Sequence, residues 1–143
     1  MIDTSHPTRL PIVEMIVGTK TFPLDESAFH FFDADLSMSS TWPQVIDDTH
    51  RLRNLQEDWD GLGAEAPVAS VVDGAILWAE SLRGRGSIAA TRVIAGMNGT
   101  IFFEWHTRRG YGELEVTSPI EAEYRWVRNG SEVAEVIALR RRS

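Results

Sequence analysis

The chain has 143 residues, of which 43% are hydrophobic and 24% charged, and these values are typical of one globular domain. It contains no cysteine, which excludes disulfides, thiolate nucleophiles and Cys-ligated metal sites and favours a reducing compartment. The net charge is −7, and neither a signal peptide nor an apolar run long enough to cross a bilayer is visible, so we expect a cytoplasmic protein that does not bind membranes.

The negative charge is concentrated in one part of the chain. Residues 25–80 contain twelve carboxylates against only Arg51 and Arg53, a local balance of −10, so the remainder carries +3. A field of that sign repels nucleic acid and favours a partner protein with a basic surface, although an acidic surface can also serve solubility alone. The twelve carboxylates are Asp25, Glu26, Asp33, Asp35, Asp47, Asp48, Glu57, Asp58, Asp60, Glu65, Asp73 and Glu80.

Residues 1–40 are expected to form an N-terminal segment separate from the main domain. Apolar residues between Ile12 and Val17, followed by 20–22, predict a short strand pair that turns at Gly18-Thr19. The Phe- and Ser-containing stretch 27–40 is typical of a loop or linker. We therefore predict an α+β domain over residues 41–139 and a solvated basic tail over 140–143.

A first helix is predicted over about residues 42–57. Ser40 or Thr41 is suitable as its N-cap, Pro43 falls in the first turn, and apolar residues recur at heptad-like spacing. Those apolar residues are Val45, Leu52, Leu55 and Trp59.

The helix is followed by the turn Asp58-Trp59-Asp60-Gly61-Leu62-Gly63. We expect its aspartates to cap the neighbouring helices and Trp59 to be a buried anchor. A calcium loop of the helix–loop–helix type is not supported, because the position that would hold the bidentate Glu is occupied by Ala69.

A second helix is predicted to open near Pro67 and to end at 84–86. Its apolar residues form a single stripe at helical spacing. Trp78 lies at the margin of that stripe, and an exposed tryptophan there would be an anchor for a partner. The stripe consists of Val68, Val71, Val72, Ala75, Ile76, Ala79 and Leu82.

The rest of the chain is typical of a β-meander with turns at Asn98-Gly99, 108–110, Ser118-Pro119 and Asn129-Gly130. A two-residue turn at Arg108-Arg109 places three apolar pairs on one face, and the other turns extend that face. We predict an α+β fold: a mainly antiparallel meander of four or five strands with two helices packed on one face. The predicted pairs are Trp105 with Gly112, Phe103 with Leu114, Ile101 with Val116, Ile94 with Phe103, Trp126 with Val133, and Ala122 with Ile137.

The opposite face of this meander gathers carboxylates, with Glu104 across from Glu113, and His106 across from Tyr111. Together with Glu115, which faces Phe102, these side chains could bind a divalent cation or supply an acid/base pair. The alternative is a solvated sheet face whose charges are relieved by arginines. The metal hypothesis uses Glu104, His106, Glu113 and Glu115, and the alternative uses Arg92, Arg108 or Arg125. No catalytic triad, zinc-hydrolase or nucleotide-binding motif is present, so no cofactor is predicted.

Three segments carry a family resemblance: Asp58-Trp59-Asp60-Gly61-Leu62-Gly63-Ala64 with Pro67, Gly99-Thr100-Ile101-Phe102-Phe103-Glu104-Trp105, and Leu114-Glu115-Val116. Over roughly residues 50–127 the chain resembles a widespread uncharacterised bacterial family of short proteins with a Trp-Asp-Gly turn and a Gly-x-Ile-x-x-Glu-Trp strand. The resemblance implies the same order of helix, turn, helix and meander. It implies no activity, and the turn 108–110 is longer here than in the family pattern.

These features favour a non-catalytic protein-interaction module, of the acidic inhibitor, antitoxin, immunity or anti-defence type. A metal-dependent hydrolase or nuclease that uses the carboxylate cluster is one alternative, and a structural subunit of a larger assembly is another. The sequence leaves the oligomeric state open. The candidate partner-binding residues are Asp33, Asp35, Asp47, Asp48, Trp78, Glu104 and Glu113.

Overall fold

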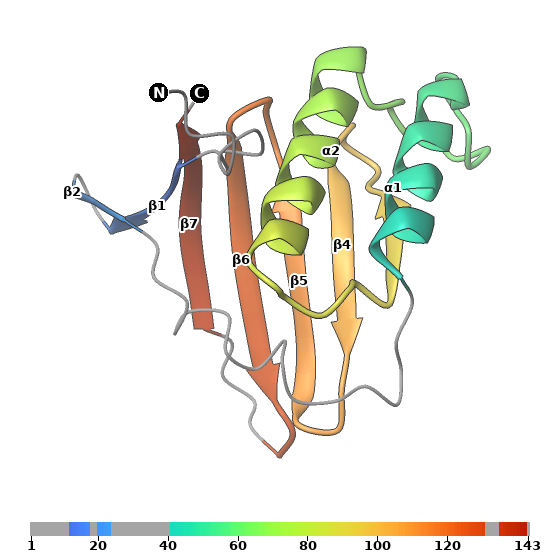
Figure 1. Ribbon diagram of the computed structural model, residues 1–143. Helices are drawn as coiled ribbons and strands as arrows, with labels where there is room; N and C mark the ends of the chain where they lie inside the picture. Colours follow the sequence, from blue (N-terminus) through green and yellow to red (C-terminus); the bar gives the residue numbers. More distant parts are fainter. Residues whose placement is uncertain (1–11, 18–19, 24–40, 131–134, 143) are drawn as a thin grey trace.

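Two helices cover one face of an antiparallel sheet (Figure 1). In the computed structural model, the residues described are 12–17, 20–23, 41–130 and 135–142. Over these residues the sheet has seven strands. The predicted α+β fold, with an antiparallel meander and two helices on one face, is confirmed.

The first helix, α1, spans Trp42–Arg51 and is followed by the 3₁₀ turn η3, Leu52–Asn54. The Thr41 hydroxyl accepts a hydrogen bond from the backbone N–H of Gln44 at 3.3 Å, so Thr41 is the N-cap. The helix ends earlier than predicted because Leu55 has an extended backbone, with φ −68° and ψ 141°. Apolar spacing alone did not distinguish helix from the irregular segment that follows it.

The second helix, α2, spans Ala69–Gly84 and ends where the sequence predicted. Val68 does not belong to its apolar stripe, because it occupies the N-cap position and is exposed. The buried residues of α2 cover much more of its surface than one stripe, and they are Val71, Val72, Gly74, Ala75, Ile76, Trp78, Ala79, Ser81 and Leu82.

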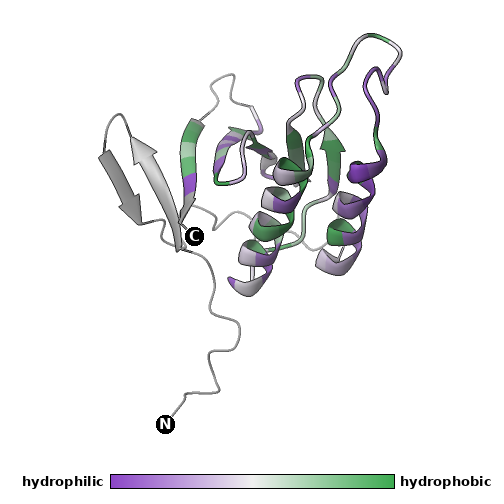
Figure 2. Cartoon of the chain, turned by 90° about the horizontal axis from the view of Figure 1, so that it is seen from above, coloured by the Kyte–Doolittle hydropathy of each residue, from purple (hydrophilic) through white to green (hydrophobic). Residues whose placement is uncertain are grey.

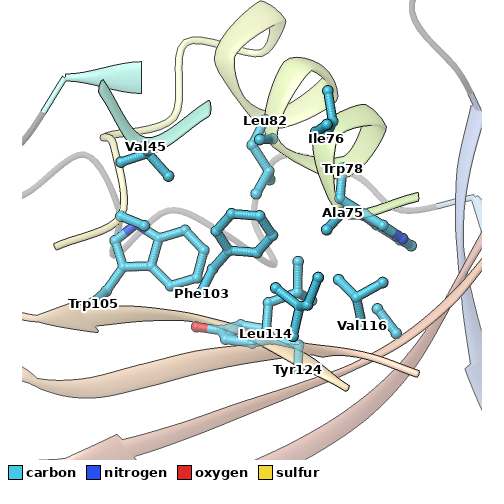
Figure 3. Close-up of a cluster of buried hydrophobic side chains, with 14 of the residues drawn as sticks. Val45, Ala75, Ile76, Trp78, Leu82, Phe103, Trp105, Leu114, Val116 and Tyr124 are labelled. Atoms are coloured by element: carbon cyan, nitrogen blue, oxygen red, sulfur yellow. The ribbon is translucent and has the colours of Figure 1, made fainter. Parts of the chain in front are cut away.

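Trp78 is fully buried, so the prediction that it could be an exposed anchor for a partner is wrong. The reason is that α2 has neighbours on several sides. It packs on the sheet and beside α1, and the backbone of Pro119, in the turn 117–120, lies directly against Gly74. Figure 3 shows the Trp78 side chain directed from the helix toward the sheet.

The five strands after the helices form the meander. They are β3 (Arg92–Ala95), β4 (Ile101–His106), β5 (Gly110–Val116), β6 (Glu121–Arg128) and β7 (Glu135–Arg142). The N-terminal strands β1 (Ile12–Val17) and β2 (Lys20–Pro23) pair with each other, and β1 also pairs with β7. The order across the sheet is β2-β1-β7-β6-β5-β4-β3. One sheet therefore continues across the boundary predicted at residue 40. Residues 140–142 belong to β7 and pair with β1, which corrects their prediction as a solvated tail.

The pairing of β4 with β5 matches the predicted register at Ile101–Val116, Phe103–Leu114 and Trp105–Gly112. The first hairpin is one residue out of the predicted register, because Ile94 pairs with Phe102 and not with Phe103.

The cause of this difference is the length of the β3–β4 turn. Gly96 N–H donates to Thr100 O at 2.8 Å, so three residues close the turn, and Gly99 takes the left-handed conformation with φ 75°. A turn that contains Asn-Gly is compatible with two or with three residues, and the sequence does not decide between them.

The last hairpin differs from the prediction by two residues. Ala122 pairs with Leu139 and Trp126 with Glu135, whereas Ile137 and Val133 were predicted. Because side chains alternate between the two faces of a sheet, a shift of two keeps the same residues on the same face. Part of the connecting turn, 131–134, lies outside the described residues.

The core lies between the sheet and the helices (Figure 3). Phe103, Trp105, Leu114 and Val116 project toward the helices and are almost completely buried. The Trp105 indole N–H donates to Ile88 O at 3.0 Å, which satisfies the one polar group of this side chain. Figure 2 shows hydrophilic residues on the outer side of α1. In the part of the chain that the structure describes, no helix combines the length and apolarity of a membrane span.

Candidate functional site

The residues predicted to bind a partner do not form one surface. Asp47 and Asp48 lie on α1, where Asp47 is exposed and Asp48 forms an ion pair with Arg51 at 3.2 Å. Asp33 and Asp35 lie outside the described residues. Glu104 and Glu113, by contrast, lie on the face of the sheet that the helices do not cover, because they alternate with core residues along β4 and β5.

Glu104 and Glu113 are directly opposite each other, as predicted, but each has its own arginine. Arg92 Nε lies 2.5 Å from one oxygen of Glu104, and an Arg125 nitrogen lies 3.3 Å from one oxygen of Glu113. Two like charges in adjacent strands are thus each neutralised locally. This arrangement is the one expected of a sheet face whose charges are relieved by arginines.

Glu104 is buried, with only 6% of its surface exposed, although it lies on the uncovered face. Burial raises the pKa of its carboxyl group, but hydrogen bonds from Arg92 and His106 outweigh that effect and leave the pKa below its ordinary value. The Tyr111 hydroxyl donates to Glu113 at 2.7 Å, and burial together with this bond raises the pKa of the phenol. Near neutral pH Glu104 is therefore ionised and Tyr111 is neutral.

The four residues of the metal hypothesis are engaged in different interactions. The His106 ring packs edge-on against Tyr111 with its Nε2 3.3 Å from Glu104, whereas Glu115 accepts a hydrogen bond from Thr100 at 2.9 Å. Within residues 41–130, and in the other described segments, no group of three or more His, Asp and Glu side chains could hold a metal ion. Ion pairs link β3 with β4 and β5 with β6, and the His106 and Tyr111 rings are in contact between β4 and β5.

A second surface is formed by the loop between α1 and α2. Its two aspartates bind backbone amides of the loop itself: Asp58 accepts from Gly63 N at 2.7 Å, and Asp60 accepts from Leu62 N at 2.8 Å and Ala64 N at 3.0 Å. The prediction that they cap the helices is wrong. Asp58 also takes a left-handed backbone with φ 62°, and its N–H donates to Ala64 O at 2.8 Å.

The loop is fastened to the β3–β4 turn. The backbone N–H of Glu65 donates to Met97 O at 2.8 Å, and the Trp59 indole N–H donates to Glu65 O at 3.1 Å. A carboxylate oxygen of Glu57 closes the base of the loop by accepting from Ala66 N at 3.1 Å. The loop and the turn therefore form one rigid end of the molecule, close to the start of α2 (Figure 1).

This end exposes apolar side chains. Of the five large hydrophobic residues that the described part of the chain leaves exposed, four are here: Trp59 at 36%, Leu62 at 87%, Val68 at 62% and Met97 at 66%. We call these four residues, with the carboxylates of Glu57, Asp58, Asp60 and Glu65, the loop surface. The prediction that Trp59 is a buried anchor is wrong.

One feature of the sequence does indicate this surface. Leu62 stands between Gly61 and Gly63, whose φ values of 74° and 89° are left-handed. A leucine flanked by two glycines has no neighbouring side chain in sequence to shield it. Exposed apolar residues gathered at one place are typical of binding sites, whereas scattered ones are not.

Backbone hydrogen bonds stabilise the charge of one carboxylate of the loop surface. The amides of Leu62 and Ala64 donate to Asp60 and lower the pKa of its carboxyl group, so the negative charge persists below the ordinary range. The loop surface thus combines apolar side chains with carboxylates, one of which, Asp60, has a lowered pKa.

No protein-family model, curated protein or solved structure matches this chain, so the family resemblance noted in the sequence stays a prediction.

Proposed function

We propose that this chain is a non-catalytic, cytoplasmic protein-interaction module, an acidic protein of the inhibitor, antitoxin, immunity or anti-defence type that binds a partner protein with a basic surface. The observation that carries this proposal is the coincidence of concentrated negative charge with the exposed apolar residues of the loop surface. Protein interfaces are built from such apolar anchors surrounded by polar and charged residues.

The negative charge of residues 41–80 lies outside the core, where it can attract a partner. Residues 41–80 contain eight carboxylates against two arginines, and none of the eight is buried. Like charges on one side of a molecule add to a field that attracts basic partners and accelerates their association. On the uncovered sheet face, by contrast, Glu104 and Glu113 are neutralised by Arg92 and Arg125, so that face contributes less to the field.

A capture experiment with the full chain tests the proposal. Immobilised protein incubated with lysate of its source cells is expected to retain one partner in stoichiometric amount, and retention should weaken as salt is raised. The variant Asp47→Asn, Glu80→Gln should retain less. The matched control Thr117→Lys, Ala138→Lys changes the net charge equally but at exposed positions outside residues 41–80, and it should retain as much as the wild type.

Two outcomes would contradict the proposal. One is the absence of any stoichiometric partner. The other is self-assembly of the pure protein into a defined oligomer, measured by size-exclusion chromatography with light scattering, which would favour a structural subunit.

A further inference from the structure

We infer that the loop surface is the docking site for a cationic amphipathic helix of the partner protein. This inference rests on the proposed function and adds to it the place of binding and the kind of segment that is bound. Four properties of the loop surface support it: the exposed anchors, the charge, the hydrogen-bonded backbone and the rigidity.

The apolar anchors require an apolar counterpart. Leu62 and Met97 each expose well over half of their surface, and Trp59 is 36% exposed even though its indole N–H is bonded to Glu65 O. Large apolar and aromatic side chains contribute to affinity when a partner covers them and excludes water. The bound segment must therefore present apolar side chains.

The charge selects what surrounds those apolar side chains. Glu57, Asp58, Asp60 and Glu65 alternate with the anchors along the loop, and no lysine or arginine lies between residues 54 and 82. Anionic lipid and nucleic acid would be repelled, and so would the same surface of a second copy of this chain. The complementary segment has apolar residues flanked by lysines or arginines.

The backbone of the loop surface argues against binding by strand addition. Peptide groups that an added strand would need are already used inside the molecule, among them those in the bonds Asp58 N to Ala64 O and Glu65 N to Met97 O. Recognition must then proceed through side chains. An α-helix satisfies its own backbone and presents an apolar stripe between two polar flanks, which is the pattern required.

The loop surface is also prepared for binding before the partner arrives. The hydrogen bonds of Asp58, Asp60 and Glu57 to loop amides fix the conformation, so little backbone entropy is lost on association. A rigid loop that exposes its apolar side chains is consistent with a docking element, because those side chains do not contribute to the core.

The experiment uses a synthetic peptide of about 18 residues, long enough to form a helix, with leucines at i, i+3, i+4 and i+7 and lysines elsewhere. It is titrated into the isotope-labelled full chain and followed by NMR. The control peptide has the same composition with its leucines distributed around the helix. The amphipathic peptide is expected to bind saturably and to shift amides in 57–68 and 97–99, and the control peptide is expected to bind at least tenfold more weakly.

Two matched variants locate the site. Leu62→Ser removes the most exposed anchor, and Val136→Ser removes the one large exposed hydrophobic residue, at 52%, that the described chain carries elsewhere. Because both positions are exposed, both variants should fold. Leu62→Ser is expected to raise the Kd for the amphipathic peptide about tenfold, a loss of about 1.4 kcal/mol, while Val136→Ser leaves it within about twofold.

Three results would overturn the inference. The first is equal binding of the two peptides, which would show attraction by charge alone. The second is a set of shifts centred on α1 or on the uncovered sheet face. The third is an unchanged Kd for Leu62→Ser. In each of these cases the proposed function would still stand if the capture experiment retained a partner. Failure of the capture experiment, by contrast, would count against the proposed function and would leave the peptide result unchanged.

Discussion

Glu104 holds a negative charge in a position where burial alone would favour the neutral acid. Its carboxylate is ionised because Arg92 and His106 supply hydrogen bonds that exceed the cost of desolvation. Its folded-state pKa is therefore below that of the unfolded chain, so the ionised form stabilises the fold. This contribution is complete above the unfolded value of about 4.5 and is lost as the pH falls through the lower folded value.

The substitution Glu104→Gln is expected to lower the free energy of unfolding by about 1–2 kcal/mol at pH 7, because a neutral amide accepts weaker hydrogen bonds. The difference from wild type should shrink as the pH falls through the lowered pKa of Glu104, because the wild-type carboxylate is then protonated as well. Urea denaturation at pH 7 and at a pH below that pKa measures this. The control Glu121→Gln, at an exposed position, should change little at either pH, and a more stable Glu104→Gln protein would mean that repulsion from Glu113 dominates.

Helix α2 is held against three neighbours, and Gly74 is the point of closest approach to one of them. A Cβ atom at this position would lie 2.7 Å from Pro119 O and 2.8 Å from Pro119 Cα, closer than real contacts allow. Glycine inside a helix normally destabilises it by about 0.5–1 kcal/mol relative to alanine. Here the absent side chain is what allows the β5–β6 turn to pack on the helix.

We therefore expect Gly74→Ala to destabilise the protein, contrary to the usual effect of this change in a helix. Forcing the turn away from α2 should cost about 1–3 kcal/mol, measured by urea or thermal denaturation. Ser70→Ala, at an exposed position of the same helix, is the matched control and should stay within about 0.5 kcal/mol of wild type. A gain in stability for Gly74→Ala would show that the turn can move without loss.

The elements differ in how well the sequence predicted them, and the difference follows from where their determinants lie. The β4–β5 register was predictable because a short turn and alternating residues on both strands decide it locally. The environment of Trp78 was not, because periodicity identifies a helix but does not reveal how many neighbours cover it. The predicted burial of Trp59 was wrong for a related reason, because its exposure depends on how the loop is bonded to Met97, which is distant in sequence.

For the molecule as a whole, the sequence predicted the two layers but not the completion of the sheet. The N-terminal strand pair was recognised from its apolar residues, yet nothing local indicated that β1 would pair with β7, at the other end of the chain. Long-range pairing of this kind depends on which edge remains open after the meander has formed. It places β7 between β1 and β6 and leaves β2 and β3 at the edges of the sheet.

This topology predicts a specific pattern of amide exchange. In a strand with antiparallel neighbours on both sides, successive N–H groups point alternately to one neighbour and to the other. Residues 138–140 pair with both β1 and β6, so removing residues 1–23 should expose every second amide in that stretch and leave the others bonded to β6. Residues 141 and 142 pair with β1 and not with β6, so both should lose protection. Residues 135–137, which among the described strands pair with β6 alone, should keep their protection.

Hydrogen exchange followed by NMR measures this pattern, and a chain lacking only residues 1–10, which retains β1, is the control. Loss of protection throughout 135–142 would mean that β7 cannot persist without β1, so that the meander is not a stable unit by itself. Alternating loss would show instead that the meander and the two helices fold together and that the N-terminal strands add to a finished sheet. The loop surface includes Met97 of the β3–β4 turn, and β3 and β4 lie at the other end of the strand order from β1 and β2. The truncated chain should therefore keep its affinity for the cationic peptide.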